Sequence, residues 1–152
     1  HELKFSVYGL QLLFSADRAT HLFQEIEPAL EQGKLVITER YAPSTLTYRS
    51  QVLANLDDGI DYTQILTSVN SPYRIPDLTL ILELDADECM RRITVRGKTP
   101  ELFEQAERLR EIMQKYHELP KNYPNMIFID ASQTKEQVTE QIVRTIEERL
   151  NI

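Results

Sequence analysis

The sequence predicts an α/β fold in which helices flank a parallel sheet, and two observations support this fold class. Three short apolar runs, at residues 35–37, 78–84 and 126–129, are typical of buried strands. Around them, apolar residues recur every three or four positions, as in amphipathic helices. Strands that alternate with helices indicate a layered architecture. Because no repeat, low-complexity tract or linker is evident, we expect residues 1–152 to form one domain.

Helices are expected on both sides of the first strand. Apolar residues at helical spacing precede it: Ala16, Ala19, Phe23, Ile26 and Leu30. They predict a helix of several turns, which Gly33 ends before the strand at 35–37 begins. A second helix is expected after Pro43 and a shorter one around residues 65–69, followed by a turn-rich connection over 70–76.

The second half of the chain contains the clearest strand, residues 78–84. Asp85 and Glu88 have the spacing of a helix start, and Gly97 is expected to end that helix. The remaining elements are, in order, a helix over 102–116, a strand at 126–129 and a helix over 138–150. Thr134 and Gln137 have the spacing of a capping box before the last helix.

Composition narrows the possible functions. The 152 residues are 41% hydrophobic and carry a net charge of -7, so a nucleic-acid polymer is a poor candidate partner, whereas a small anion is compatible. Cys89 is the only cysteine, which excludes an internal disulfide and fits a reducing compartment. No signal peptide is evident, and no apolar run approaches the roughly 20 residues of a membrane span. We therefore expect a cytoplasmic protein without a membrane segment.

The strand at 35–37 leads into a carboxylate and a guanidinium, Glu39 and Arg40. In an open α/β sheet, chemistry collects outside the carboxyl ends of the strands. There, Glu39 offers a group for a metal or a proton, and Arg40 offers one for phosphate oxygens, which suits phosphoryl transfer. The alternative is a surface ion pair at a strand end, and this segment alone leaves the choice open.

A second candidate site is a cluster of cations in an otherwise acidic chain. Residues 89–98 contain no acidic residue and four basic ones, Arg91, Arg92, Arg96 and Lys98. Arg92 and Arg96 share a helix face. A flap at Arg96-Gly97-Lys98 could close over a polyphosphate, and the alternative is a solvated basic face.

A third candidate site combines an aromatic ring with nearby polar groups. Phe14 and Arg18 lie four residues apart on one predicted helix face, where the ring could stack on a base and the guanidinium could donate to its edge. Ser44, Thr45 and Tyr48 offer hydroxyl groups for a pyrimidine edge and a sugar. Core packing of Phe14 and an N-cap role for Ser44 are the alternatives.

Taken in order, these segments resemble the thymidylate kinase family. The matching segments are 12–18, 28–33, 36–41 with Ser44, Thr45 and Tyr48, 76–82, Arg96-Gly97-Lys98 before Phe103-Glu104, and 129–132. The likeness extends from about Leu12 to the C-terminus, and the flap is most similar to that of archaeal members. It implies a three-layer, P-loop kinase-like parallel sheet flanked by helices, with a lid near residues 91–103.

The resemblance also implies an activity and residue roles. The implied reaction is transfer of the γ-phosphoryl group from ATP to dTMP, with Mg²⁺, giving dTDP and ADP. The implied contacts with dTMP are Phe14 stacked on thymine, Arg18 at the thymine edge, Ser44 and Thr45 near the base, Tyr48 against the deoxyribose and Arg40 on the phosphate. Family members are usually homodimers, so we expect one here.

The implied roles on the ATP side fall to other residues. Glu39 would orient the metal, and Arg96, with Arg92 and Lys98, would stabilise charge on the transferring group. Ala131 would approach adenine through its backbone. A lid arginine of this kind raises the rate of phosphoryl transfer by several orders of magnitude.

The sequence departs from the family in lacking the phosphate loop Gly-x-x-x-x-Gly-Lys-[Ser/Thr]. In the family's sheet, the strand before that loop lies between the strands expected at 35–37 and 78–84, whose edges would otherwise be unpaired. We therefore expect the first strand and the loop upstream of His1. Glu39 also replaces the family's usual Asp, and Arg49-Ser50 its usual Gln-Gly.

Two other functions remain as alternatives. A deoxynucleoside kinase also places Glu-Arg after a strand but phosphorylates a free 5′-hydroxyl group. A non-catalytic nucleotide-binding module would have lost its phosphate loop. Arg18 and Arg40 together favour a substrate that already carries a phosphate.

Overall fold

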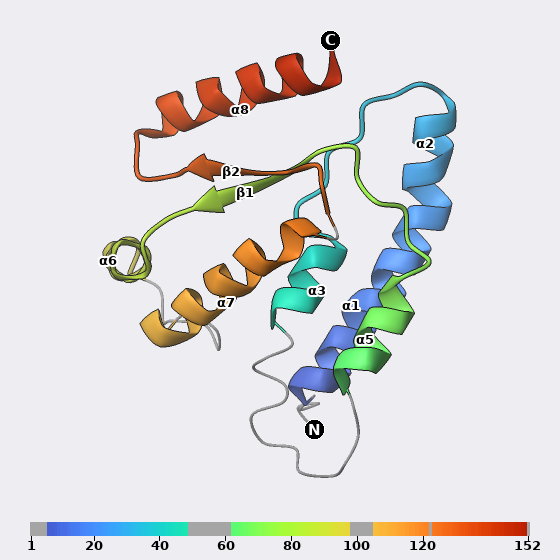
Figure 1. Ribbon diagram of the computed structural model, residues 1–152, viewed down its shortest axis with the longest axis horizontal. Coiled ribbons are helices and arrows are strands. Elements are labelled where there is room, and N and C mark those ends of the chain that lie inside the picture. The colour runs from blue at the N-terminus through green and yellow to red at the C-terminus, as the bar shows by residue number, and fades with distance from the viewer. Residues whose placement is uncertain (1–5, 49–61, 98–104, 122, 152) are drawn as a thin grey trace. The chain divides into compact units, whose positions relative to one another are not determined.

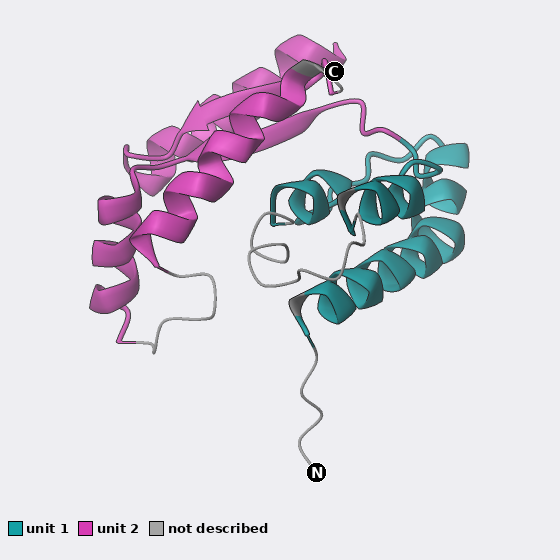
Figure 2. Cartoon of the chain, turned by 60° about the horizontal axis from the view of Figure 1, so that its bottom comes forward, with its two compact units in different colours: residues 1–74 teal, residues 75–152 magenta. Residues whose placement is uncertain are grey.

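The structure is a computed structural model that describes residues 6–48, 62–97, 105–121 and 123–151. The chain divides into two compact units, unit 1 (His1–Arg74) and unit 2 (Ile75–Ile152), drawn in different colours in Figure 2. The sequence predictions for Arg49-Ser50, Lys98 and the rest of the lid to residue 103 lie outside the described residues. That residues 1–152 act as one domain stays a prediction.

The described part of unit 1 is helical (Figure 1). Its elements are α1 (Val7–His21), the π-helix η1 (Leu22–Ile26), α2 (Glu27–Glu31), α3 (Ala42–Tyr48) and α5 (Tyr62–Asn70). The helix predicted around residues 16–30 is confirmed as α1, η1 and α2 in succession. It starts earlier than predicted, because the Ser6 side chain accepts a hydrogen bond from the Gly9 amide and caps α1. Gly33 follows α2 at φ 71°, as expected for a C-terminal stop.

The prediction of a strand at residues 35–37 is wrong. These residues belong to no strand, and Leu35 and Ile37 are 58% and 78% exposed. In the part of the chain that the structure describes, the sheet consists of two strands from unit 2. An apolar run becomes a strand only when a neighbouring strand satisfies its backbone N–H and C=O groups, and nothing described here pairs with residues 35–37.

Unit 2 is an α/β unit, which confirms the predicted fold class. Strand β1 (Thr79–Glu83) pairs in parallel with β2 (Met126–Asp130), from Thr79 opposite Met126 to Glu83 opposite Asp130. The helical elements are α6 (Ala86–Val95), α7 (Ala106–Glu118), the short 3₁₀ helix η2 (Leu119–Lys121) and α8 (Lys135–Leu150). Figure 1 shows α8 and α7 on opposite sides of the two strands, which makes three layers.

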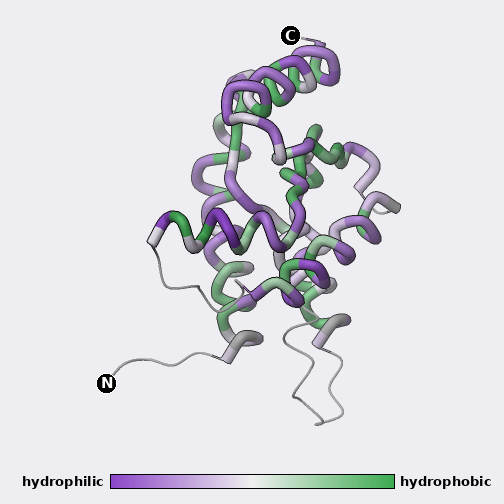
Figure 3. Tube along the Cα trace, turned by 90° about the vertical axis from the view of Figure 1, so that its left-hand side faces the viewer, coloured by the Kyte–Doolittle hydropathy of each residue, from purple (hydrophilic) through white to green (hydrophobic). Residues whose placement is uncertain are grey.

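The core of unit 2 lies between the sheet and its helices. Its buried apolar residues are Ala86, Ile93, Ile112, Met126 and Ile129. Hydrophobic and hydrophilic residues alternate along the helices, as Figure 3 shows, because one face of each packs inward. No helix in the described ranges is both long and apolar enough to cross a bilayer.

The helix starts predicted at Asp85 and Thr134 are confirmed, whereas residues 98–104, before α7, lie outside the described residues. The Asp85 carboxylate accepts hydrogen bonds from the amides of Asp87 and Glu88 at 2.9 and 3.2 Å. Thr134 and Gln137 form the reciprocal capping box of α8, with side chain-to-amide distances of 3.3 and 3.1 Å. These positions were predictable because capping depends on neighbouring residues alone.

Replacing Thr134 with alanine should destabilise the protein by about 1 kcal/mol, because the Gln137 amide in the first turn of α8 loses the hydroxyl group that accepts its hydrogen bond. Equilibrium urea unfolding measures this change. Thr139→Ala is the matched control on the same helix, since its hydroxyl only donates to the Lys135 carbonyl, and we expect a change within about 0.5 kcal/mol. Equal losses from the two variants would contradict the capping account.

Candidate functional site

The candidate site in unit 1 is organised around the guanidinium of Arg18 on α1. Its Nη1 donates to Asn70 Oδ1 at 2.6 Å, and its Nη2 donates to Thr45 Oγ1 at 3.1 Å. Thr45 belongs to α3 and is 1% exposed, and Asn70 ends α5 and is 5% exposed. One side chain therefore joins three helices that are far apart in the sequence.

Aromatic rings lie close to the same guanidinium. The Arg18 Cζ atom is 5.5 Å from the centre of the Tyr41 ring and 5.9 Å from that of Tyr73. Both distances fall within the range of a cation–π interaction, which a partly desolvated site strengthens. The Tyr73 hydroxyl also donates to the Ser15 carbonyl of α1 at 2.7 Å. Together these contacts restrict where the Arg18 side chain can point.

Phe14 lies one turn before Arg18 on α1, and this residue is 49% exposed. The structure therefore does not support the alternative that this ring is a core residue. Ser44 lies inside α3, which begins at Ala42, so Ser44 is not the N-cap of that helix. The amide of Ser44 donates to the Tyr41 carbonyl at 3.0 Å. The structure places Phe14, Arg18, Ser44 and Thr45, which the sequence predicts to share a site, in unit 1.

Arg40 and Tyr48 form a second contact in unit 1. Arg40 Nη1 donates to the Tyr48 hydroxyl at 3.1 Å, and its Cζ atom lies 5.4 Å from the Tyr48 ring centre. The Arg40 backbone has φ 63°, a left-handed conformation that is uncommon for a residue with a side chain and often occurs at functional sites. This conformation directs an exposed guanidinium onto the ring predicted to contact a sugar.

Glu39 precedes Arg40 and has an exposed side chain. Among the described residues, no three His, Cys, Asp or Glu side chains gather into a metal site of their own. Mg²⁺, however, commonly binds through one or two carboxylates together with substrate phosphates. A single exposed carboxylate beside a candidate phosphate-binding arginine fits that mode of binding.

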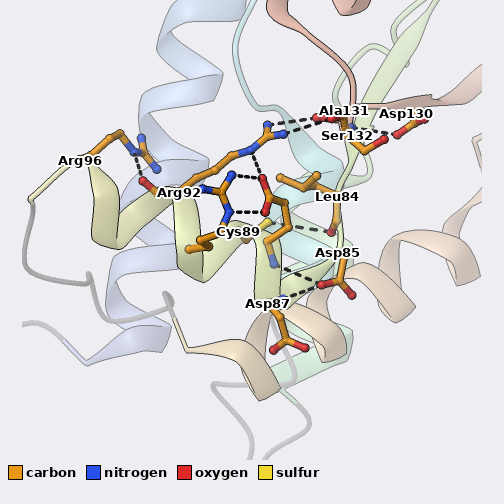
Figure 4. Close-up of polar contacts among 11 residues, drawn as sticks. Leu84, Asp85, Asp87, Cys89, Arg92, Arg96, Asp130, Ala131 and Ser132 are labelled. Atoms are coloured by element: carbon orange, nitrogen blue, oxygen red, sulfur yellow. Dashed lines mark hydrogen bonds and ion pairs between the residues drawn. The ribbon is translucent and has the colours of Figure 1, made fainter.

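Unit 2 contains a separate set of contacts around Arg92, shown in Figure 4. Arg92 Nη1 donates to the Ala131 carbonyl at 3.1 Å, and Nη2 donates to the Ser132 carbonyl at 3.4 Å. Arg92 Nε donates to Glu88 Oε1 at 2.8 Å. Arg92 therefore braces the turn after β2 against α6, and it lies beside Ala131, the residue whose backbone is predicted to approach adenine.

Arg96 lies apart from this brace, at the end of α6. Its side chain is exposed, and its Nε is 3.4 Å from the Arg92 carbonyl. Sequence reasoning treated Arg92, Arg96 and Lys98 as one group of lid cations. The structure gives Arg92 backbone partners and leaves Arg96 on the surface, while Lys98 lies outside the described residues.

The Glu88 carboxylate holds this arrangement together. It accepts from Arg91 Nε and Nη2 at 2.6 and 2.8 Å as well as from Arg92. These hydrogen bonds lower the pKa of Glu88 from 4.5 to about 2, and the one from Arg91 has the larger effect, followed by the one from Arg92. Hydrogen bonds from Ser132 likewise lower the pKa of Asp130 in the adjoining turn.

Several residues of these contacts were not predicted from the sequence. Asn70 lies in a segment predicted to be a turn, and Glu88 was assigned only to a helix start. Asn70 reaches a partner 52 residues away, and no local pattern reports such a contact. Glu88 precedes Arg91 and Arg92 by three and four residues on a helix, and this spacing is a sequence signal for their ion pairs.

The low pKa of Glu88 predicts a pH dependence. Because the pKa in the folded protein lies below the ordinary value, the stabilisation from this carboxylate is present above about pH 4.5 and is lost as the pH falls toward 2. In an NMR titration of the side-chain carboxyl carbon, we expect a midpoint near 2. Replacing Arg91 and Arg92 together with alanine should move it toward 4.5, whereas Arg144→Ala on α8 should not. A midpoint near 4.5 in the unaltered protein would contradict the arrangement.

Comparison with known proteins identifies the family. A family model described as thymidylate kinase matches residues 1–142. Proteins named probable thymidylate kinase are similar to this chain: that of Pyrococcus horikoshii is 35% identical over 97% of this chain and 68% of its own length. The protein of Thermococcus onnurineus is 33% identical over 91% of this chain and 64% of its own length. That of Pyrobaculum calidifontis is 38% identical over 90% of this chain and 66% of its own length. The chain spans about two thirds of the length of these archaeal relatives. The chain belongs to the thymidylate kinase family, whose members have a P-loop kinase fold.

Proposed function

We propose that the protein transfers the γ-phosphoryl group of ATP to dTMP and releases dTDP and ADP. The observation that carries this proposal is the position of Arg18, whose guanidinium is held by Asn70 and Thr45 one helical turn from the half-exposed ring of Phe14. A flat apolar ring beside fixed N–H donors is suited to a planar base whose edge accepts hydrogen bonds. The names of the relatives support thymine as that base.

The other acceptor-site roles follow from this placement. With thymine stacked on Phe14 and its edge facing Arg18, Ser44 and Thr45 of α3 would lie near the base. Tyr48, at the end of α3, would contact the deoxyribose. Arg40 would exchange its contact with the Tyr48 hydroxyl for the dTMP phosphate, a stronger partner because both groups are charged.

The donor-side roles belong to the predicted lid and to the turn after β2. Arg96, with Lys98, would stabilise charge on the transferring group. The backbone of Ala131 would contact adenine, and Arg92 would keep that turn in place through its carbonyl groups. When bound, Mg²⁺ would neutralise phosphate charge, with Glu39 as its carboxylate ligand. Phosphoryl transfer needs alignment and positive charge more than covalent groups, and these side chains supply both.

We further propose a cytoplasmic homodimer that acts on small nucleotides, with residues 91–103 as its lid. Leu13 and Phe23 are exposed large apolar side chains on α1 and η1, which supports an interface between protein chains.

An assay of ADP release tests the choice of acceptor. We expect turnover with dTMP and little with thymidine, because Arg40 and Arg18 suit a substrate that carries both a phosphate and an accepting base edge. Equal or greater turnover with thymidine would favour a deoxynucleoside kinase. Binding of dTMP with no ADP release in the full natural protein would favour a non-catalytic module.

Two arginine variants separate binding from chemistry. Arg18→Ala should raise the KM for dTMP by about 10-fold or more, since a charge-assisted hydrogen bond is lost. Arg96→Ala should lower kcat by about 10³-fold with a much smaller change in that KM, because a lid arginine acts mainly in the transition state. Arg144→Ala, which removes an exposed α8 ion pair with Glu148, is the control. A kcat that is unaffected by Arg96→Ala would exclude the proposed lid role.

A further inference from the structure

We propose that Asn70 is a positioning residue that fixes the direction of the Arg18 guanidinium and so selects 4-keto pyrimidines, such as thymine, over 4-amino pyrimidines. This inference rests on the proposed function, because it concerns the base of the same acceptor nucleotide. Asn70 would not contact the nucleotide itself. It would act through Arg18, to which its carboxamide oxygen is bonded at 2.6 Å.

The hydrogen bonds of Asn70 leave one orientation for its carboxamide. Asn70 is 5% exposed, and its Nδ2 donates to the Leu66 carbonyl at 2.7 Å and to Ser15 Oγ at 3.2 Å. A carbonyl oxygen only accepts and a guanidinium only donates. The nitrogen must therefore face Leu66, and the oxygen must face Arg18. Reversing the amide would place donor against donor and acceptor against acceptor in a buried site.

Asn70 can fix the direction of the Arg18 guanidinium because hydrogen bonds to two helices hold the Asn70 side chain itself in place. Through Leu66 it is anchored in its own helix, α5, and through Ser15 it is anchored to α1, three residues before Arg18. The Ser15 hydroxyl in turn donates to the Gln11 carbonyl at 2.9 Å. Because Thr45 Oγ1 accepts from the other terminal nitrogen of Arg18, two acceptors on different helices define the plane of the guanidinium.

A fixed guanidinium discriminates between bases by their hydrogen-bonding groups. Thymine and uracil present a carbonyl oxygen at position 4, which accepts from an N–H group. Cytosine presents an amino group there, which meets the guanidinium donor against donor. A buried polar site rejects a ligand that leaves its groups unpaired more strongly than it rejects a change of one methyl group. The orientation of Arg18 should therefore matter for dTMP and dUMP and matter little for dCMP.

Two substitutions distinguish positioning from a general packing role. Asn70→Leu removes the acceptor for Arg18 and both donors at similar size. Asn70→Asp keeps an acceptor for Arg18 and removes both donors. If Asn70 acts through Arg18, the aspartate variant should retain base selectivity and the leucine variant should lose it. If Asn70 only holds the end of α5, both variants should be similarly impaired. Ser68→Ala, an exposed site on α5, is the control.

The measurement is the Kd of the protein for dTMP, dUMP and dCMP by calorimetry, which requires no turnover. In Asn70→Leu we expect dTMP and dUMP to bind about 10-fold more weakly, with dCMP changed by less than about threefold. Asn70→Asp and Ser68→Ala should keep the dTMP-to-dCMP ratio within about threefold of the unaltered protein. Equal weakening for all three nucleotides, or equal loss of selectivity in both Asn70 variants, would overturn the inference.

The outcomes separate this inference from the proposed function. If the unaltered protein does not prefer dTMP to dCMP, the proposed acceptor is wrong and the inference falls with it. If the preference exists and survives Asn70→Leu, the inference alone fails. Should Asn70→Leu not fold, the Arg18 Nη protons in the nucleotide-free, unaltered protein decide the matter by NMR. Separate signals that exchange slowly among the Arg18 Nη protons support a fixed guanidinium. A single averaged signal, like the one expected for exposed Arg144, overturns the inference.

Discussion

The hydrogen bond from Arg18 to Asn70 is the contact on which the geometry of the candidate site in unit 1 depends. It ties α1 to α5 inside a core where Gln11, Ser15, Thr45 and Asn70 are buried polar residues. A buried polar group that loses its partner costs about 1–3 kcal/mol, and more when the group is charged. Such a core is stable only if its hydrogen bonds are made together, so the network that stabilises the helices also fixes the side chain proposed to face the base.

Unit 2 uses an arginine in a similar way on its own elements. Arg92 joins α6 to the turn after β2 through backbone carbonyl groups, and Glu88 holds Arg92 from one turn away. Both units therefore keep a predicted nucleotide-binding segment in place with a guanidinium that has defined partners. In each unit a second cation, Arg40 or Arg96, is exposed, and these are the residues that we propose to bind the charged phosphate groups.

The parts of the structure that the sequence predicted depend on neighbouring residues. The caps at Asp85 and Thr134 are local, and the strands β1 and β2 coincide with the apolar runs at 78–84 and 126–129. Residues 35–37 show the limit of this reasoning, because a strand also needs a partner that the run itself does not reveal. The same limit applies to Asn70, which contacts Arg18 across 52 residues, whereas Phe14 and Arg18 were predictable from their spacing on one helix.

The central claim is that a fixed Arg18 beside Phe14 receives the base of the acceptor nucleotide, and a crystal structure of the protein with dTMP tests it most directly. The account predicts thymine against the Phe14 ring, with its 4-keto oxygen about 3 Å from the Arg18 guanidinium and Arg18 still bonded to Asn70. Thymine bound away from Phe14, or Arg18 turned away from Asn70 and from the base, would contradict it.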